Sequence, residues 1–219
     1  LRTRMLKLGK YAKAFIVHDD ELLPHFSQEL KPYIVPLRIE PERFTPEYPD
    51  PAKGKVTIVH APSNRGVKGT KYIHSAVENL KKKYDIEYIL VENMTQNEAF
   101  KEYQKADIIV DQILGGSYGV FSIEAMAMGK PVITYITDEM IKTFPDELPI
   151  VSASPLNIQE EIEKLINDGQ IRHDLGVKGR KYIETYHDCK KNAKVIAKIY
   201  EGTANKTKGK DAFEEVKEF

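Results

Sequence analysis

The sequence of 219 residues carries 33 basic and 33 acidic side chains, so its formal net charge is zero. General nucleic-acid binders and membrane-surface binders need an excess of basic side chains, and the balance argues against both classes. The length suits one domain of ordinary size with additional elements.

The chain holds a single cysteine, Cys189, which excludes an internal disulfide and fits a reducing compartment. No apolar stretch approaches the roughly 20 residues that span a bilayer, and no secretory signal opens the sequence. We therefore expect a cytoplasmic protein. Leu1 lies inside an amphipathic segment, so we interpret the chain as a fragment.

Residues 1–50 contain a predicted helix, strands at 14–18 and 33–37, and most of a proline-rich stretch at 41–54. Such a stretch is typical of a linker between domains. We interpret residues 1–50 as the trailing part of an N-terminal domain together with its linker.

From residue 51 to residue 202, short β-rich runs alternate with helical patterns, which predicts βαβ units and a parallel sheet. In the last third of this region, Ser154 is the expected helix cap and Pro155 the first helical residue. The predicted strands are 56–61, 86–91, 107–114, 130–136 and 148–153. The predicted helices are 69–84, 96–106, 120–128, 154–167, 171–186 and 189–202. The fold class is therefore α/β, a Rossmann-like parallel sheet flanked by helices, and residues 203–219 follow as a polar tail that is mobile or loosely docked.

Two strand-to-helix loops carry unusual chemistry, and open parallel sheets bind ligands beyond the carboxyl ends of their strands. The first loop, HAPSNRGVKGTKY at 60–72, places Arg65 and Lys68 on either side of Gly66, just before a helix. A helix N-terminus offers free amides, and two added cations make it an anion site. The spacing matches neither the phosphate loop nor the dinucleotide fingerprint. The alternative is a solvated charged turn.

The second loop, ILGGSYGVFSIEAM at 113–126, contains Gly115, Gly116 and Gly119, where the backbone can approach a ligand closely. Glu124 lies about one and a half turns into the next helix, in an apolar run where an ionised carboxylate needs a partner. A carboxylate accepts two hydrogen bonds from a vicinal diol, so a ribose ring would suit it. The alternative is a bond to a backbone amide or a lysine.

Together the loops predict a site for a nucleoside diphosphate, with cations for the phosphates and a carboxylate for the sugar ring. The pattern R..KGT, followed by AD...G.YG...EAMA.GKPVI, resembles the C-terminal, nucleotide-sugar-binding domain of family 4 (group 1) glycosyltransferases. These enzymes have the GT-B fold of two facing Rossmann-like domains. The resemblance covers about residues 53–202. It extends more faintly over the first 50, where YIVPLRIEPERFTP is similar to the family's interdomain stretch.

The resemblance implies a hexosyltransferase-like enzyme of carbohydrate biosynthesis. Such an enzyme moves a sugar from a UDP-, GDP- or ADP-linked donor to a carbohydrate or lipid-linked acceptor with retention of configuration. It needs neither a metal nor another cofactor, and no nucleic-acid partner is implied. Membrane association, at the inner face of the membrane, would depend on the missing N-terminal domain. The fragment alone is expected to bind the donor without efficient turnover, because catalysis needs both walls of the cleft.

The family's functional residues carry over to matched positions of this sequence. Lys68 is implied to bind the diphosphate, the amides near Gly119 and Val120 to cap its oxygens, and Glu124 to bind the ribose. The expected catalytic residues are Arg65, Lys68 and Glu124. The expected donor-binding residues are Ser63, Asn64, Arg65, Gly66, Lys68, Gly116, Ser117, Tyr118, Gly119, Val120 and Glu124.

The chain also departs from the family pattern. Gly116 stands at the position of the family's first motif glutamate, which touches the donor sugar, and Asp111 and Ser117 are candidates to replace it. Ser63 stands at the position of the family's arginine, so the role of Arg65 depends on loop geometry. The segment between the strands at 86–91 and 107–114 is short, which leaves the base preference open.

Three other functions stay open at this point. A nucleotide-sugar 2-epimerase shares the architecture but uses further acidic and histidine residues that the sequence does not offer. A non-catalytic binding module is compatible with Gly116, because this glycine stands where the family has its first motif glutamate. A redox Rossmann enzyme lacks its dinucleotide fingerprint.

Smaller features are interpreted conservatively. His60 is either a structural histidine or a residue of the cleft, and Tyr118 is the tyrosine expected at the cleft. Cys189 is interpreted as a packed small side chain. No metal site is predicted, because HDDELLPHF at 18–26 has no metal-ligand spacing.

Overall fold

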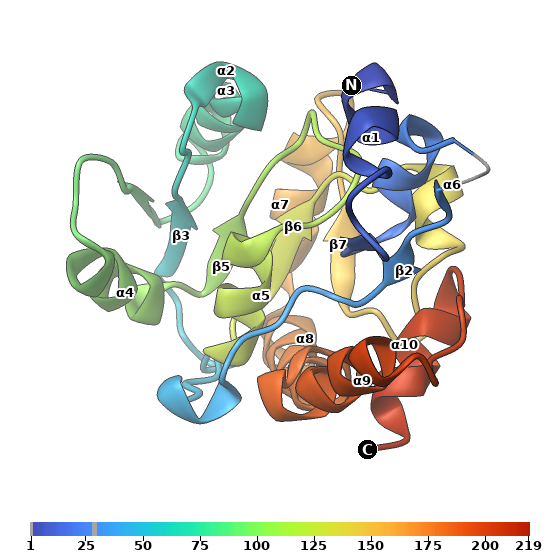
Figure 1. Ribbon diagram of the computed structural model, residues 1–219. Coiled ribbons are helices and arrows are strands. Elements are labelled where there is room, and N and C mark those ends of the chain that lie inside the picture. Colours follow the sequence, from blue (N-terminus) through green and yellow to red (C-terminus); the bar gives the residue numbers. More distant parts are fainter. Residues whose placement is uncertain (1, 28–29) are drawn as a thin grey trace. The chain divides into compact units, whose positions relative to one another are not determined.

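The computed structural model describes residues 2–27 and 30–219 (Figure 1). The chain forms two compact units. The larger unit consists of Glu42–Thr137 and Glu147–Glu184, and the smaller unit consists of the chain up to Pro41, Asp138–Asp146 and Thr185–Phe219. The predicted divisions after residues 50 and 202 follow the order of the sequence, whereas the smaller unit gathers three separate stretches of the chain.

The larger unit is built on a parallel sheet with the strand order β4-β3-β5-β6-β7. Ile58 of β3 lies opposite Tyr88 of β4 on one side and Ile108 of β5 on the other. The strands are β3 (Val56–His60), β4 (Ile86–Leu90), β5 (Ile108–Val110), β6 (Val132–Thr134) and β7 (Ile150–Ser152). Each of them falls within a predicted strand, and all neighbouring pairs are parallel, which confirms the predicted fold class.

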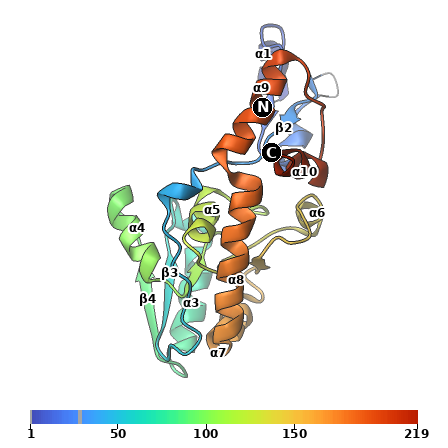
Figure 2. The ribbon, with the colours of Figure 1, turned by 90° about the horizontal axis from the view of Figure 1, so that it is seen from below.

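Helices cover both faces of this sheet (Figure 2). Helix α3 packs against α7, and α5 packs against α8. Val56 and Ile58, which alternate along β3, join the apolar cluster with α3 and α7, as the two-residue period of a strand requires. Burial of one such side chain contributes about 1.5–3 kcal/mol. The helices are α2 (Arg65–Lys68), α3 (Thr70–Leu80), α4 (Gln96–Lys105), α5 (Val120–Ala127), α7 (Ile158–Asn167) and α8 (Gly169–Tyr182).

The strand order creates a switch point in the middle of the sheet. The chain leaves β3 for β4 at one side and returns to β5 at the other side of β3. Ligands of open α/β sheets bind beyond the carboxyl ends of such a strand pair. Both unusual loops start here, one after His60 and one after Val110.

The smaller unit contains a pair of short parallel strands, β1 (Ile16–Val17) and β2 (Tyr33–Ile34). Cys189, the first residue of α9, is half-buried. The helices of this unit are α1 (Arg2–Leu8), the 3-10 helix η1 (Asp20–His25), α6 (Asp138–Ile141), α9 (Cys189–Glu201) and α10 (Lys210–Lys217). The 3-10 helix η3 (Pro41–Arg43) and the π-helix η4 (Ile183–His187) lie where the chain passes from one unit to the other.

The tail at 203–219 differs from the mobile or loosely docked segment that we expected. It ends in α10, which buries Ala212, Phe213 and Val216. Phe213 packs edge-on against Phe144 and Tyr186 of the same unit. The three apolar side chains recur at helical spacing, and this period outweighs the lysine-rich composition of the segment.

The helix predicted at 154–167 begins later than expected. The N–H and the hydroxyl of Ser154 both donate to Oδ1 of Asn157, at 2.9 and 3.2 Å. This local turn competes with the helix, so α7 begins only at Ile158 and Pro155 precedes it.

Candidate functional site

The first loop forms a single helical turn held at both ends. Asn64 accepts hydrogen bonds from the N–H groups of Gly66 and Val67, at 2.9 and 3.1 Å, and so caps α2. The turn ends at Gly69, whose φ of 76° is left-handed. A Cβ at Gly69 would lie only 2.6 Å from Cγ1 of Ile113. Glycine therefore permits both the bend and the close approach of the second loop.

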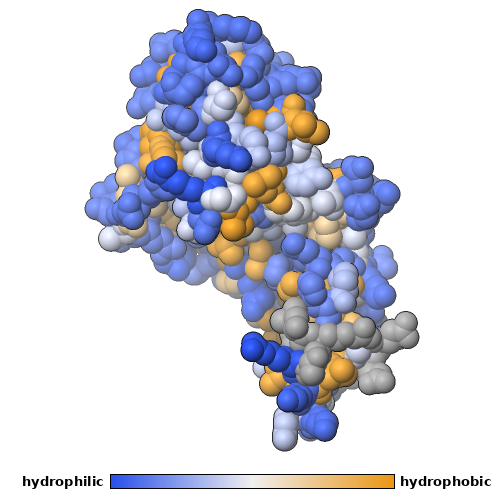
Figure 3. Space-filling view, turned by 90° about the horizontal axis from the view of Figure 1, so that it is seen from above, coloured by the Kyte–Doolittle hydropathy of each residue, from blue (hydrophilic) through white to orange (hydrophobic). Residues whose placement is uncertain are grey.

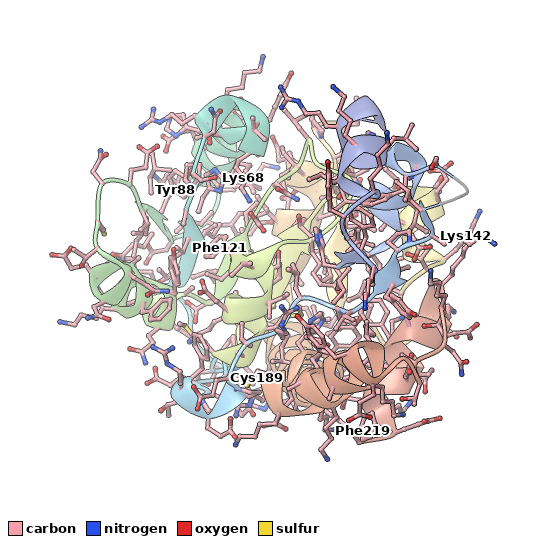
Figure 4. All side chains as sticks on the ribbon, in the orientation of Figure 1. Lys68, Tyr88, Phe121, Lys142, Cys189 and Phe219 are labelled. Atoms are coloured by element: carbon pink, nitrogen blue, oxygen red, sulfur yellow. The ribbon has the colours of Figure 1, made fainter. Side chains whose placement is uncertain are left out.

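Asp111 joins the two loops. Nζ of Lys68 donates to Oδ1 of Asp111 at 2.6 Å, and the hydroxyl of Ser122 donates to Oδ2 at 2.7 Å. Asp111 is fully buried, and 13% of the Lys68 side chain is exposed. Figure 4 labels Lys68 and also Phe121, the residue next to Ser122 in α5. Breaking such a buried pair leaves an uncompensated charge, so the contact fixes the ammonium group at the switch point.

His60, at the end of β3, joins the start of α3 to β5 through its two ring nitrogens. Its Nδ1 lies 2.8 Å from the carbonyl oxygen of Val110, and its Nε2 lies 2.8 Å from the hydroxyl of Thr70. A carbonyl only accepts, so Nδ1 carries the proton and Nε2 accepts from Thr70. Burial lowers the pKa of His60, and the ring is fully buried. This histidine is structural, the first of the two interpretations.

Arg65 is directed to another part of the surface. Its Nε donates to Oε1 of Glu92 at 2.8 Å, and its Nη2 contacts Oε2 of the same carboxylate. The hydrogen bonds from Arg65 lower the pKa of Glu92. The Arg65 side chain is 64% exposed, and its partner follows β4. Arg65 therefore does not share the Asp111 contact of Lys68.

The glycine-rich part of the second loop is mostly buried. Gly116 has a φ of 155°, and its carbonyl accepts from the N–H of Thr137 at 3.0 Å. Ser117 is buried, and its carbonyl accepts from Nε2 of Gln112 at 2.5 Å. Tyr118 is buried as well, with its hydroxyl 3.3 Å from that of Tyr182 in α8. The side chains of Ser117 and Tyr118 are thus both buried, and Tyr118, which was expected at the cleft, contacts Tyr182.

The start of α5 is open to a ligand. Gly119 is its N-cap and makes no side-chain capping bond. A Cβ at Gly119 would meet no atom within 4 Å, and Val120 is 50% exposed. Because the first N–H groups of a helix have no partner within it, this end can receive acceptor oxygens.

Glu124 is half-buried one turn further along α5. Burial raises its pKa, and a hydrogen bond from the side chain of Gln96 lowers it in part. The polar group that acts on this carboxyl is thus the side chain of Gln96 in α4. The pKa of Tyr103 is raised to about 12, by burial first and then by the charges of Glu124 and Asp111. Tyr103, which packs 4.8 Å from Phe121 between ring centroids, lies within electrostatic range of both carboxylates.

Parts of the two loops around the Lys68–Asp111 contact are apolar and solvent-accessible. The face of the molecule in Figure 3 shows orange apolar atoms scattered among hydrophilic ones, and exposed apolar residues also occur in the two loops. Val67 and Leu114, one from each loop, are 62% and 45% exposed. A pocket of about 590 Å³ lies beside the first loop and is lined by Arg65, Gly66, Thr70, Lys71, Tyr72, His74, Leu90 and Leu114. That volume lies within the range of small-molecule sites, which combine apolar walls with a few polar groups.

Of the predicted donor-binding residues, Ser63, Asn64, Arg65 and Gly66 are exposed, and Lys68 is half-buried. Sequence reasoning missed Ser122, Gln96, Tyr103 and Glu92. Ser122 precedes Glu124 by two positions in an otherwise apolar helix, and that polar residue was an available signal.

Neither a metal centre nor a membrane span is found in the described part of the chain. Within residues 2–27 and 30–219, no group of three or more His, Cys, Asp or Glu residues could hold a metal ion. Over the same ranges, no helix is both long and apolar enough to cross a bilayer.

Comparison with known proteins places the fold. No family model matches the sequence. A comparison with curated proteins finds no significant match. Solved structures do match. Sucrose-phosphate synthase from Thermosynechococcus elongatus superposes with a TM-score of 0.68 and 17% identity over 91% of this chain and 61% of its own. HepE of Anabaena, solved in complex with UDP, superposes with a TM-score of 0.68 and 11% sequence identity, over 88% of this chain and 65% of its own.

A third match has the length of one domain. The C-terminal domain of a group 1 glycosyl transferase, LpcC, from Francisella tularensis gives a TM-score of 0.52 and 20% identity over 69% of this chain and 99% of its own. By contrast, the chain spans only about three fifths of the length of sucrose-phosphate synthase. These matches confirm the predicted resemblance at the level of the fold.

Proposed function

We propose that this chain is the donor-binding part of a glycosyltransferase and binds a nucleoside diphosphate sugar at the switch point. The observation that carries the proposal is the Asp111 contact, which brings Lys68 of the first loop to Ser122 of the second. The fold shared with UDP-bound HepE supports it. One molecule that carries both phosphates and a ribose fits a site with a cation, free helix amides and a carboxylate.

Each group has a distinct proposed role. The Lys68 ammonium and the amides at the start of α5 face the diphosphate, and Glu124 accepts hydrogen bonds from the ribose hydroxyls. As the sugar departs, negative charge grows on the diphosphate, and fixed donors that meet it are worth several kcal/mol. The cation and the amides supply this charge stabilisation, so we propose transfer without a metal. Retention of configuration is proposed from the resemblance to family 4 alone.

The wider activity is proposed on the same basis. The acceptor is a carbohydrate or a lipid-linked carbohydrate, which a full-length enzyme would bind opposite the donor. One observation favours a second candidate, binding without transfer: Gly116 offers no side chain, and Asp111 and Ser117 are buried. No observation favours a 2-epimerase.

The test separates the two ends of the ligand. Calorimetry and saturation-transfer NMR compare UDP, UDP-glucose, GDP and uridine on the parent chain and on Lys68→Met and Glu124→Gln. We expect Lys68→Met to weaken UDP at least tenfold while uridine is unaffected, because uridine has no phosphate. We expect Glu124→Gln to weaken UDP and uridine alike.

Matched controls come from α7. Lys164 is 57% exposed and pairs with Glu160 and Glu161 at the helix surface. Lys164→Met and Glu160→Gln remove the same charges and should bind like the parent chain. At a ligand concentration 100 times Kd, binding stabilises by about 2.7 kcal/mol, or about 5–11 °C in Tm at 2–4 °C per kcal/mol. Equal binding by Lys68→Met and Lys164→Met would show that the diphosphate lies elsewhere.

A further inference from the structure

The pocket beside the first loop lies apart from the Asp111 contact. Its described lining includes Arg65 and Gly66 of α2 but neither Lys68 nor Asp111. The other lining residues come from the start of α3, the end of β4 and the second loop: Thr70, Lys71, Tyr72, His74, Leu90 and Leu114. All of them belong to the larger unit. The roles proposed above leave this space of about 590 Å³ unused.

The pocket and Glu124 lie on opposite faces of the sheet. Helix α3, which supplies four of the eight lining residues, packs against α7. Helix α5, which carries Glu124, lies with α4 on the other face (Figure 2). Lys68 meets Asp111 at the switch point, where both loops leave the sheet. A linear molecule whose diphosphate contacts Lys68 and whose ribose contacts Glu124 therefore extends its remaining end, the sugar, toward the α3 face.

The polar groups of the pocket suit an anion. Lys71 and His74 are exposed, and neither forms an ion pair within 4.0 Å among residues 2–27 and 30–219. None of the described lining residues is acidic. Arg65 differs from these two, because its guanidinium is already paired with Glu92. The Lys71 ammonium and the His74 imidazole, which keeps at least one ring N–H in either charge state, are thus the groups left to receive a negative charge.

Aromatic rings position both groups. Nζ of Lys71 lies 4.6 Å from the centroid of the Tyr72 ring. The imidazole of His74 lies 6.0 Å from the ring of Tyr88 in β4, a residue labelled in Figure 4. Such contacts are attractive and restrict the rotamers of the two side chains. Less conformational entropy is therefore lost when they bind a ligand.

We propose that the sugar of the donor is a hexuronic acid whose carboxylate binds Lys71 and His74. Charge-assisted hydrogen bonds between an ammonium group and a carboxylate are stronger than bonds between neutral groups. A neutral hexose would leave the Lys71 ammonium without an acidic partner. Leu90 and Leu114 contact the C–H groups of the sugar ring, as apolar walls do in small-molecule sites. The inference rests on the proposed function, since it takes the diphosphate to lie at Lys68.

The experiment compares four ligands on the 219-residue chain by calorimetry. They are UDP, UDP-glucose, UDP-glucuronate and UDP-glucuronamide, in which an amide replaces the carboxylate. We expect UDP-glucuronate to bind at least tenfold more tightly than UDP-glucose, because one hydrogen bond to a charged group is worth about that factor. UDP-glucuronamide should bind like UDP-glucose. A chain that prefers GDP is tested in the same way with GDP-mannose and GDP-mannuronate.

The outcomes separate the inference from the proposed function. If neither UDP nor GDP binds, the proposed function fails. If the nucleotide binds and the uronate has no advantage over the neutral sugar, the inference about the sugar fails and the proposed function stands. An advantage of UDP-glucuronamide equal to that of UDP-glucuronate would also overturn the inference, because the charge would then play no part.

Variants test the two named groups. Lys71→Gln combined with His74→Gln should lower the affinity for UDP-glucuronate to that for UDP-glucose, while the affinity for UDP stays unchanged. Lys71→Arg should keep the preference, because it keeps the charge. The control Lys82→Gln removes one ammonium from an exposed position just beyond the other end of α3. Equal loss by Lys71→Gln and Lys82→Gln would indicate general attraction to net charge and would refute the assignment.

Discussion

The contact between Lys68 and Asp111 makes a quantitative prediction about stability. Lys68→Met would leave the fully buried carboxylate of Asp111 with the hydroxyl of Ser122 as its side-chain partner among residues 2–27 and 30–219. Removing one member of a buried pair costs about 3–5 kcal/mol. At about 2–4 °C per kcal/mol, Tm should fall by about 6–20 °C. Asp111→Asn should cost less, because the partly exposed Lys68 ammonium can turn toward water.

The double variant isolates the pair itself. With both charges gone, no unpaired charge stays buried, so the cost should fall below the sum of the single costs by about 2 kcal/mol. Urea unfolding followed by circular dichroism or tyrosine fluorescence measures all four proteins, because the chain has 12 tyrosines and no tryptophan. Additivity within about 0.5 kcal/mol would refute the reasoning, since contacting residues should not behave as independent ones.

Three further outcomes follow from single residues. Gly69→Ala should lower Tm, with a cost of about 1–3 kcal/mol, because it combines a left-handed φ with a clash against Ile113; Gly119→Ala serves as the control. Glu124→Gln should raise the pH 7 stability of the free chain and should leave the binding of uridine, which has no phosphate, independent of pH in the range where the Glu124 carboxyl titrates. A carboxyl whose folded pKa is raised is most stabilising when protonated, and that contribution is lost as pH rises through the folded pKa. His187 is fully buried against the carbonyl of Leu37, and its pKa is lowered to about 4. Because the unfolded chain then binds the extra proton more readily, the free energy of unfolding should fall by about 3 kcal/mol as pH drops from about 6.5 to 4. Urea titrations of His187→Asn should no longer show this loss of stability with falling pH.

Much of the fold was predictable because local patterns and tertiary structure agree. The strand at 56–60 is buried on both faces, as a parallel strand covered by helices must be, and Gly202 ends α9 with a φ of 75°. Ser154 shows where this agreement stops. Its side chain has two available partners, the helix amides and Asn157, and the sequence does not rank them.

The site was predictable in its positions and less so in its contacts. The glycine spacing and Lys68 mark both loops, and the two meet at the switch point. Yet the partner of Arg65 is Glu92, which lies 27 positions further along the chain. Asp111 was a candidate for contact with the sugar, whereas its carboxylate holds Lys68 and Ser122. Such pairings depend on strand order, which no local pattern encodes.

The empty space beside Gly119 makes the molecule suitable for spectroscopy. A Cβ there would meet no atom within 4 Å, so a cysteine can be introduced at this position, and the native thiol at Cys189 belongs to the other compact unit. One substitution thus yields a pair of attachment points for spin labels, one in each unit. The distance between the two labels, measured in solution with and without a nucleotide, would show whether binding changes the arrangement of the two units.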